Sequence, residues 1–213
     1  ALDQAPMDRF VTEPGRAAEL LAALEGSGRV RDREVRLKGG EAEFWGLVSL
    51  EAVTFDSQPA VLAWVYDITE RKAAELEYRK LFLAVERSPA SVVITDSTGV
   101  IEYVNPRFTL TTGYTAAEAI GSTARLCKSG TTSDAVYKDL WKTILSGRNW
   151  RGELLNRKKC GGLYWEHIDI APITEADGVI THFVAVKADI TEQKRAAEAL
   201  LIVKEVAAAA QAA

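Results

Sequence analysis

Apolar and polar positions alternate along the chain with two periods, one typical of strands and one typical of helices. Short runs rich in β-branched and aromatic residues predict strands over 30–37, 43–55, 60–67, 91–95, 100–104, 150–158, 163–173 and 179–189. Apolar residues at helical spacing predict one helix that begins near Thr12 and stops at Gly26, and another that begins at Ser133 and stops at Gly147. The polar residues 56–58 between two of the runs predict a hairpin turn.

The second half of this pattern repeats the first. Asp67-Ile68-Thr69-Glu70 recurs as Asp189-Ile190-Thr191-Glu192, 122 positions later (67 to 189). Phe44-Trp45 recurs as Tyr164-Trp165, 120 positions later (44 to 164). Landmarks in the same order at a nearly constant offset predict two tandem domains, because a solenoid would need a much shorter period.

The second copy has a front half that the first copy lacks. Its two additional strands are separated by Ser97-Thr98-Gly99, which predicts a hairpin. Asn105-Pro106 caps a short helix, and Thr115 with Glu118 forms a capping box for the next one. The first copy begins at its long helix, so we interpret it as the C-terminal part of a domain.

Two charged helices are predicted outside the copies, and they complete the domain organisation. The helix between the copies carries an apolar stripe at Ala74, Tyr78, Leu81 and Val85. The helix over 191–211 carries Leu200, Val203 and Ala207 at the spacing of a short coiled coil. We expect a homodimer through both helices, with packing of the first against the chain's own sheet as the alternative. The predicted divisions are 1–72 for the partial first domain, 73–87 for a linker helix, 88–190 for the second domain and 191–213 for a signalling helix.

Composition excludes several classes of function. The net charge of −4 and the pI of about 5.4 argue against general nucleic-acid binding, which needs a basic surface. No apolar run approaches the roughly 18 residues of a spanning helix, and the first residues do not show the basic-then-apolar pattern of a signal peptide, so a cytoplasmic location is expected. Two cysteines and two histidines, with no phosphate-binding loop and no Ser/His/Asp set, predict neither a metal site nor an enzyme.

The second copy resembles the PAS family of sensor domains. The motifs that carry the resemblance are Ile94-Thr95-Asp96, the run 101–105, Thr112-Gly113-Tyr114, Ile120-Gly121 and the terminal Asp-Ile-Thr-Glu. The resemblance implies an α+β fold, in which a five-stranded antiparallel sheet with flanking helices surrounds a ligand cavity. It implies such domains in tandem, as the sensory input region of a bacterial signal-transduction protein. The expected output domain lies in the same chain and belongs to a histidine kinase or a cyclic-dinucleotide enzyme.

One subgroup of the family matches more closely. Asp139-Leu140-Trp141 and the run 150–159 resemble the FAD-binding PAS domains of bacterial redox sensors of nitrogen fixation and methane oxidation. This resemblance implies that Trp141 and Asn156 contact the isoalloxazine ring of FAD. An amide offers a donor and an acceptor to the pyrimidine edge, and an indole offers a surface for stacking. Strand alternation places Asn156 inward and Arg157 outward, where Arg157 and Lys158 could meet a pyrophosphate at the pocket mouth.

Four further residues are predicted to belong to the cavity. Phe108 and Thr123 are weaker candidates for its wall. Glu166 and Lys187 match positions at which light-sensing flavin domains carry asparagine and glutamine. They could pair with each other, Lys187 could stabilise a reduced anionic flavin, or both could be a solvated strand end.

Three positions limit the chemistry further. Light-sensing flavin domains carry a cysteine at the position of Ala124, so cysteine–flavin photochemistry is not expected, and Cys127 is predicted to be a small buried apolar residue. The long helix of the second copy has no histidine for haem, and both histidines are expected on the surface. In the first copy, Leu37 and Val65 replace Asn156 and Lys187, so no flavin is expected there.

The alternatives to a flavin sensor are a ligand-free dimerisation and relay module and a sensor of a small metabolite. If a flavin is bound, its reduction or oxidation is expected to change the hydrogen bonding at Asn156. The sheet is then expected to transmit this change to Asp189 and the terminal helix.

Overall fold

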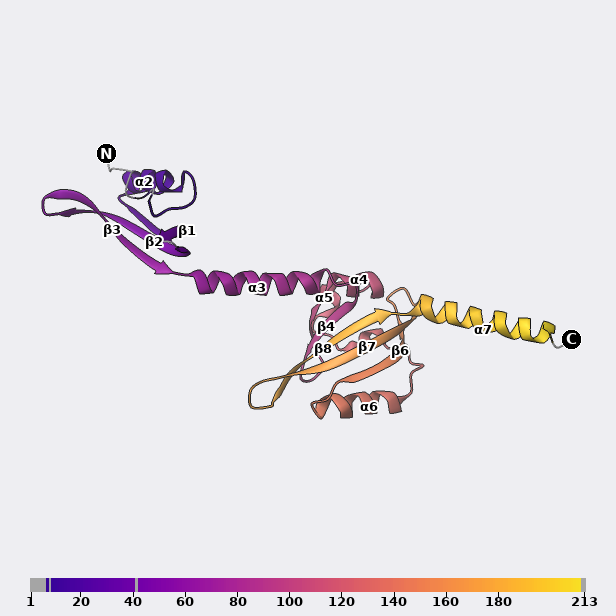
Figure 1. Ribbon diagram of the computed structural model, residues 1–213. Coiled ribbons are helices and arrows are strands. Elements are labelled where there is room, and N and C mark those ends of the chain that lie inside the picture. Colours follow the sequence, from indigo (N-terminus) through magenta and orange to yellow (C-terminus); the bar gives the residue numbers. More distant parts are fainter. Residues whose placement is uncertain (1–6, 8, 41, 212–213) are drawn as a thin grey trace. The chain divides into compact units, whose positions relative to one another are not determined.

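The computed structural model describes residues 7, 9–40 and 42–211, with side chains described as far as residue 205. The chain divides into two compact units, Ala1–Leu81 and Phe82–Ala213 (Figure 1). The division falls inside the helix that was predicted as a linker. Each unit has its own sheet and its own core.

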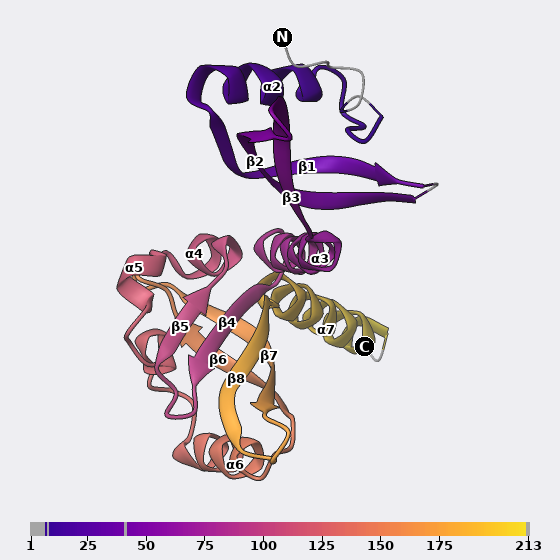
Figure 2. The same ribbon diagram turned by 90° about the vertical axis from the view of Figure 1, so that its left-hand side faces the viewer.

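Unit 1 is a helix followed by a three-stranded meander. Its elements are α2 (Arg16–Ser27), β1 (Arg29–Gly39), β2 (Ala42–Phe55) and β3 (Gln58–Asp67), and the strands pair antiparallel in the order β1-β2-β3. The helix α2 lies over the sheet of unit 1 (Figure 2), and its Leu20 and Leu24 belong to one buried cluster with Val35 of β1 and Val48 of β2. The predicted strands and the hairpin turn are confirmed, since Asp56 and Ser57 have φ values of 48° and 61°.

The prediction that α2 stops at Gly26 is wrong. Gly26 lies in the last turn of the helix, and the cap is Gly28, whose φ is 73° and whose N–H donates to Leu24 O. Only a residue without a Cβ adopts this left-handed conformation readily, so the helix continues until it reaches the glycine that can end it.

The linker helix α3 (Thr69–Glu86) contains no buried residue. Tyr78 and Leu81 of the predicted apolar stripe are 71% and 62% exposed. The C-terminal end of α3 contacts the sheet of unit 2, where the ring of Phe82 lies 6.4 Å from that of Tyr103 and Glu86 accepts a hydrogen bond from the Tyr103 hydroxyl. Most of the apolar stripe is therefore not covered by the chain's own sheet.

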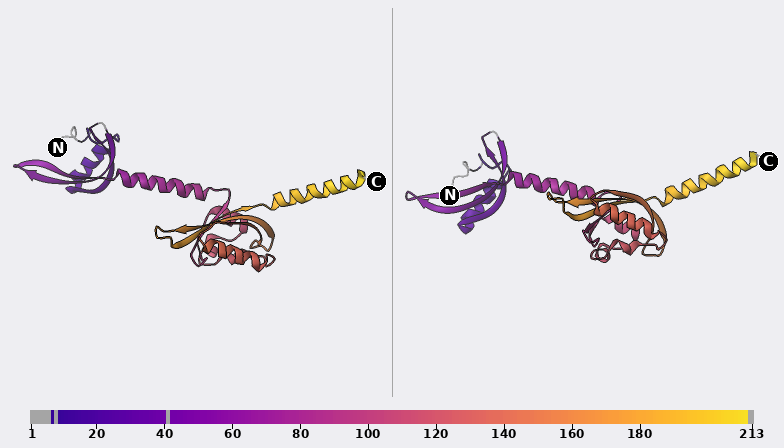
Figure 3. Two further views of the ribbon diagram at one scale, coloured as in Figure 1. Left: turned by 60° about the horizontal axis from the view of Figure 1, so that its bottom comes forward. Right: turned by 90° about the horizontal axis from the view of Figure 1, so that it is seen from below.

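Unit 2 is a five-stranded antiparallel sheet with its short helices and α6 on one face (Figures 2 and 3). Its elements are β4 (Ser91–Asp96), β5 (Ile101–Val104), α4 (Pro106–Thr112), α5 (Ala116–Ala119), a 3₁₀ helix η1 (Ala124–Cys127), α6 (Asp134–Leu145), β6 (Trp150–Arg157), β7 (Leu163–Thr174), β8 (Ile180–Asp189) and α7 (Thr191–Gln211). The strand order is β5-β4-β8-β7-β6. The predicted five-stranded antiparallel sheet is confirmed.

Two predicted caps hold the front half together. The side chain of Asn105 accepts from the N–H groups of Phe108 and Val92 and donates to the carbonyls of Val85 and Ala90. Its amide therefore joins the end of α3, the start of α4 and β4. The capping box of Thr115 and Glu118 is present as predicted.

The core of unit 2 consists of two clusters on the helix-covered face of the sheet. The first contains Phe108 of α4, Cys127 of η1 and Val93 of β4. The second contains Leu140 and Ile144 of α6 together with strand residues. Residues of both clusters contribute to the wall of one cavity.

Candidate functional site

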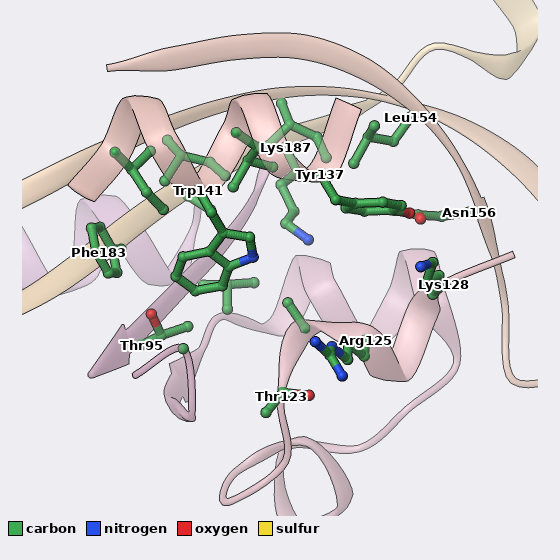
Figure 4. A pocket seen from close by; sticks show the side chains of 18 of the residues that line it. Thr95, Thr123, Arg125, Lys128, Tyr137, Trp141, Leu154, Asn156, Phe183 and Lys187 are labelled. Atoms are coloured by element: carbon green, nitrogen blue, oxygen red, sulfur yellow. The ribbon is translucent and has the colours of Figure 1, made fainter. Parts of the chain in front are cut away.

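The cavity of unit 2 has a volume of about 590 Å³ and lies between the sheet, α6 and η1 (Figure 4). This volume is within the range of small-molecule and cofactor sites. Its apolar wall includes Leu140, Ile144, Leu154, Ile168 and Phe183. Its polar wall contains threonine, tyrosine, asparagine and charged side chains, which can fix the orientation of a ligand.

Trp141 extends from α6 into this cavity, where Figure 4 shows its ring among the lining side chains. The ring meets Phe183 edge-on, with centroids 6.0 Å apart and an interplanar angle of 87°. A Cβ at Gly99 would lie 2.8 Å from the indole, so the turn between β4 and β5 needs a glycine at this point. The indole is 37% exposed and so retains free surface for a planar ligand.

A buried polar cluster lies on β6, β7 and β8. Asn156 and Lys187 are each diagonal neighbours of Glu166 across a strand pair. Asn156 Nδ2 donates to Glu166 Oε2 at 2.8 Å, and Lys187 Nζ lies 3.5 Å from the same oxygen. All three residues are buried, with Asn156 5%, Glu166 1% and Lys187 8% exposed. The predicted pairing of Lys187 with Glu166 is confirmed, and burial excludes the alternative of a solvated strand end.

Two residues that the sequence analysis did not assign to the site extend this cluster. Tyr164 donates from its hydroxyl to Glu166 Oε1 at 3.2 Å. Burial raises the pKa of Tyr164 and the charge of Glu166 raises it further, so the phenol remains a donor. Cys127 is buried, as predicted, and burial raises the pKa of its thiol. The alternation of Tyr164, Glu166 and Ile168 on one strand face was the signal that could have placed Tyr164 here.

The cations at the cavity differ from those predicted. Arg125, Lys128 and Lys138 line it, whereas Arg157 and Lys158 do not. The guanidinium of Arg157 donates to Ser129 O at 2.9 Å, because this side chain leaves the outward face of β6. Lys158 pairs with Asp189 at 3.4 Å. Arg157 and Lys158 are therefore not at the cavity wall, and the cations there are Arg125, Lys128 and Lys138, beside the carboxylate of Asp134.

The remaining predicted residues divide between the cavity and the core. Thr123 lines the cavity. Phe108 does not, because α4 directs it into the first core cluster, where it is 2% exposed. Both histidines are partly exposed, each near a carboxylate, as surface residues were expected to be. Within the described residues, no group of three His, Cys, Asp or Glu side chains could hold a metal ion.

Hydrogen bonds also organise the junction at which the last strand, β8, passes into the terminal helix α7. Asp189 Oδ1 accepts from the N–H of Thr191 at 3.0 Å, at the point where β8 ends and α7 begins. Thr191 Oγ1 accepts from the N–H of Trp165 at 2.9 Å, and Ile190 donates to Trp165 O at 2.9 Å. These bonds join the first turn of α7 to β7.

Known proteins share the sequence pattern of this chain. The PAS fold profile matches residues 79–190. The nitrogen fixation regulatory protein of Klebsiella oxytoca is 36% identical over 110 residues, which cover 52% of this chain and 22% of that protein. A blue-light-activated histidine kinase of Rhizobium johnstonii is 31% identical over 128 residues, 58% of this chain and 37% of that protein. This chain therefore spans only a minor part of the length of these relatives.

A solved structure described as "Flavin Analogue Sheds Light on Light-Oxygen-Voltage Domain Mechanism" matches with a TM-score of 0.50 and 25% identity, over 59% of this chain and 94% of that one. The family profile matches a single segment of 112 residues (79 to 190) out of 213, which is more than half of the chain. No described helix is long and apolar enough to cross a membrane. The chain belongs to the PAS family, and its matched segment is a sensory domain related to nitrogen-fixation regulators and light-oxygen-voltage sensors.

Proposed function

We propose that unit 2 binds a flavin, as FAD, and acts as a redox sensor. The observation that carries this proposal is the Asn156–Glu166–Lys187 cluster, three buried polar groups of which Asn156 and Lys187 line the cavity beside apolar residues of the sheet and α6. Burying an amide and an ion pair costs free energy unless every group finds a partner. A ligand with a polar edge and an apolar body satisfies both parts of the wall.

The parts of a flavin dinucleotide have counterparts in the cavity. Asn156 and Lys187 would meet the polar edge of the isoalloxazine, and Trp141 would pack against its ring. Arg125, Lys128 and Lys138 would meet the phosphates of the dinucleotide. Bound flavin would supply a reversible redox couple, while the chain itself binds, orients and shields it. The relatedness to light-oxygen-voltage sensors supports a flavin, and the three cations support a phosphate-bearing one.

The absorbance spectrum of the purified chain tests the proposal. We expect the bands of oxidised flavin, which disappear on reduction and return on exposure to air. Chromatography of the cofactor released by heat is expected to give FAD and not FMN. A colourless preparation that takes up no added flavin would contradict flavin binding and would favour the relay module or the small-metabolite sensor.

We propose further that α7 carries the signal to an output domain in the same protein, a histidine kinase or a cyclic-dinucleotide enzyme in the cytoplasm. Asp189 holds the start of α7 through Thr191, and Thr191 is bonded to β7. Asp189→Ala is therefore expected to keep flavin and fold but to uncouple redox state from output in the full-length protein. Asp67→Ala, at the same junction of unit 1, is the matched control. Output that still follows the flavin in Asp189→Ala would show that coupling runs elsewhere.

A homodimer is proposed from exposed apolar side chains on the two long helices. In α7, four consecutive apolar residues are between 55% and 63% exposed: Leu200, Leu201, Ile202 and Val203. In α3, Leu81 is 62% exposed. Since patches of this kind mark association surfaces, glutamate at both Leu81 and Leu200 is expected to convert a dimer to a monomer by light scattering. A wild-type chain that is already monomeric would contradict the dimer.

We also propose that unit 1 is a partial second copy of the PAS fold. The support is its helix and three-stranded meander, which follow the same order as α6, β6, β7 and β8. The matched family segment, residues 79–190, includes none of the strands of unit 1, so this relation rests on the internal repeat and on the junction that both units share.

A further inference from the structure

Glu166 lies behind the wall of the cavity. Its side chain is 1% exposed, and the residues that line the cavity include its partners Asn156 and Lys187 but not Glu166 itself. A carboxylate buried to this degree is costly unless it is paired and hydrogen-bonded. Its contacts therefore determine what the lining residues can offer to a ligand.

The carboxylate determines how the amide of Asn156 is turned. An ionised carboxylate only accepts hydrogen bonds, whereas an amide has a donor end and an acceptor end. The 2.8 Å bond therefore joins the donor Nδ2 of Asn156 to Glu166 Oε2, because the opposite orientation would bring two oxygens together. Asn156 Oδ1 receives no hydrogen bond from the described residues, so it is the acceptor that remains for a ligand.

The neighbouring polar group of the wall is a donor. Lys187 Nζ lies 3.5 Å from Glu166 Oε2, and Figure 4 shows its side chain ending inside the cavity. An ammonium group has three donors and no acceptor, so one contact with Glu166 leaves donors for a ligand. The wall therefore presents an acceptor at Asn156 and a donor at Lys187.

Tyr164 holds the carboxylate in this position. Its hydroxyl donates to Glu166 Oε1 at 3.2 Å, while Oε2 is held by Asn156 and Lys187. Tyr164 is itself 1% exposed, so water does not compete for this bond. Rotation of the carboxylate would break hydrogen bonds that the buried site cannot replace.

We propose that Glu166 is a positioning residue that sets the hydrogen-bonding polarity of the cavity. Asn156 accepts from one edge of the ligand, and Lys187 donates to the same edge. The ligand class that fits this pair is a flat heterocycle with an N–H group beside a carbonyl, such as the imide edge of a flavin. The inference rests on the proposed function, because flavin is the member of this class used to test it.

The first test needs no ligand. In ¹H–¹⁵N spectra of the whole chain, the side-chain NH₂ of Asn156 is identified by its absence in Asn156→Ser. The bond to Glu166 is expected to separate the shifts of its two protons and to slow their exchange with water. Both effects are expected to vanish in the double variant Glu166→Leu/Lys187→Met, which removes both charges and leaves neither buried alone. A freely exchanging NH₂ in the wild type would overturn the inference.

The second test measures the consequence for binding. A flavin methylated at its imide nitrogen cannot donate to Asn156 Oδ1, so the wild type is expected to bind it about tenfold more weakly than unmethylated flavin. Glu166→Gln keeps a carbonyl that accepts from Asn156 and is expected to keep the preference. The double variant is expected to lose it, because the amide is then free to turn.

The outcomes separate this inference from the proposed function. A wild type that binds both flavins equally overturns the positioning role and leaves flavin binding intact. A preference that persists in the double variant also overturns it, because the bulk of the methyl group would then be the cause. A wild type with a held Asn156 amide that binds neither flavin contradicts the proposed function and overturns the ligand class.

Discussion

Trp45 of unit 1 and Trp165 of unit 2 occupy the same place in two nearly identical junctions between strand and helix. In each, the backbone N–H of the tryptophan donates to a threonine hydroxyl, at 3.0 Å to Thr69 and at 2.9 Å to Thr191. In each, an aspartate accepts from the N–H of that threonine. In each, a lysine of the following helix lies over the indole, at 5.5 Å in unit 1 and 5.2 Å in unit 2.

The two units differ at the aromatic and polar positions of the cavity. Leu20, Leu21 and Leu24 of α2 stand 120 positions before Leu140, Trp141 and Ile144 of α6 (20 to 140). Leu21 is 3% exposed and belongs to the core, whereas Trp141 is 37% exposed and lines the cavity. At the positions of the polar cluster, unit 1 carries apolar or small residues: Leu37, Gly46 and Val65.

This contrast separates the two tasks proposed for unit 2, ligand binding and signal exit. The junction is built from hydrogen bonds between the middle strand of the meander and the first turn of the following helix, and it forms in both units although polar side chains lie under the sheet of unit 2 and not at the same positions of unit 1. The polar cluster occurs in unit 2, where α4, α5, η1 and α6 enclose the face that carries it. We conclude that exit geometry and ligand chemistry can be changed independently, and four predictions test this.

Introducing into unit 1 the asparagine that unit 2 carries at Asn156 is expected to have the largest effect, a loss of stability. Leu37 is 7% exposed and packs in the core, so Leu37→Asn removes apolar contact and buries an amide without partners. The cost is about 3–5 kcal/mol, seen as faster hydrogen exchange in β1 and β2. Lys38→Asn, at the exposed next position, is the control and is expected to change stability by less than about 0.5 kcal/mol. Similar small effects of both variants on stability would contradict the assignment of Leu37 to the core of unit 1.

Removing the same amide from unit 2 is expected to affect binding. Asn156→Ala leaves the polar edge of the flavin without a partner, which costs about 1–3 kcal/mol, or roughly ten- to hundredfold in affinity. Trp141→Ala is expected to weaken binding through lost stacking, and Leu37→Asn in unit 1 to leave it unchanged. Fluorescence titration with flavin measures all three. Full affinity in a stable Asn156→Ala would show that the pocket assignment is wrong.

Equal responses of the two junctions are expected from equal substitutions. Thr191→Val and Thr69→Val each remove the acceptor of a tryptophan N–H, at a cost of about 1 kcal/mol. Hydrogen exchange of the Trp165 and Trp45 amides reports the loss locally. Neither variant is expected to change flavin affinity by more than about twofold, because neither threonine lines the cavity. A response in one junction only would show that the two are not equivalent.

The smallest expected effect is on pH dependence. Burial alone would raise the pKa of Asp189, but hydrogen bonds from Thr191 and the charge of Lys158 bring it below its usual value. Its stabilisation is therefore present above the unfolded pKa of about 3.9 and is lost as pH falls through the folded value. Thr191→Val is expected to raise the pKa of Asp189 by removing the hydroxyl donor. The pKa of Asp67, lowered by the hydroxyl and N–H of Thr69, is expected to stay where it is.

A ¹³C NMR titration of the aspartate carboxyl groups measures both pKa values. An unchanged pKa of Asp189 in Thr191→Val would show that the hydroxyl does not stabilise its ionised form. A matching rise at Asp67 in Thr69→Val would extend the equivalence of the junctions to their electrostatics.

Local patterns in the sequence were sufficient for most elements of the fold. The period of two along 150–158 placed Asn156 inward and Arg157 outward, because successive side chains of a strand point to opposite faces. Asn105 and the pair Thr115 and Glu118 marked helix starts, because their side chains satisfy N–H groups within a few residues. The end of α2 was missed because two glycines lay close together and only backbone conformation distinguishes them.

The site depended on contacts between residues that are distant in sequence. The direction of α4 determines that Phe108 enters the core and not the cavity, and the turn of η1 brings Arg125 and Lys128 to the cavity. No pattern along the chain contains these directions, because they follow from how helices pack on the sheet.

The division between sequence and tertiary structure is clearest in the polar cluster. Residue type and strand period alone indicate that Asn156, Glu166 and Lys187 share one face of the sheet. Whether they touch depends on register, since Leu154 lies opposite Glu166, and Ile168 opposite Lys187. A slip of one residue would turn a strand's side chains to the other face. The packing of all five strands selects the register, and with it the hydrogen bonds that give the cavity its polarity.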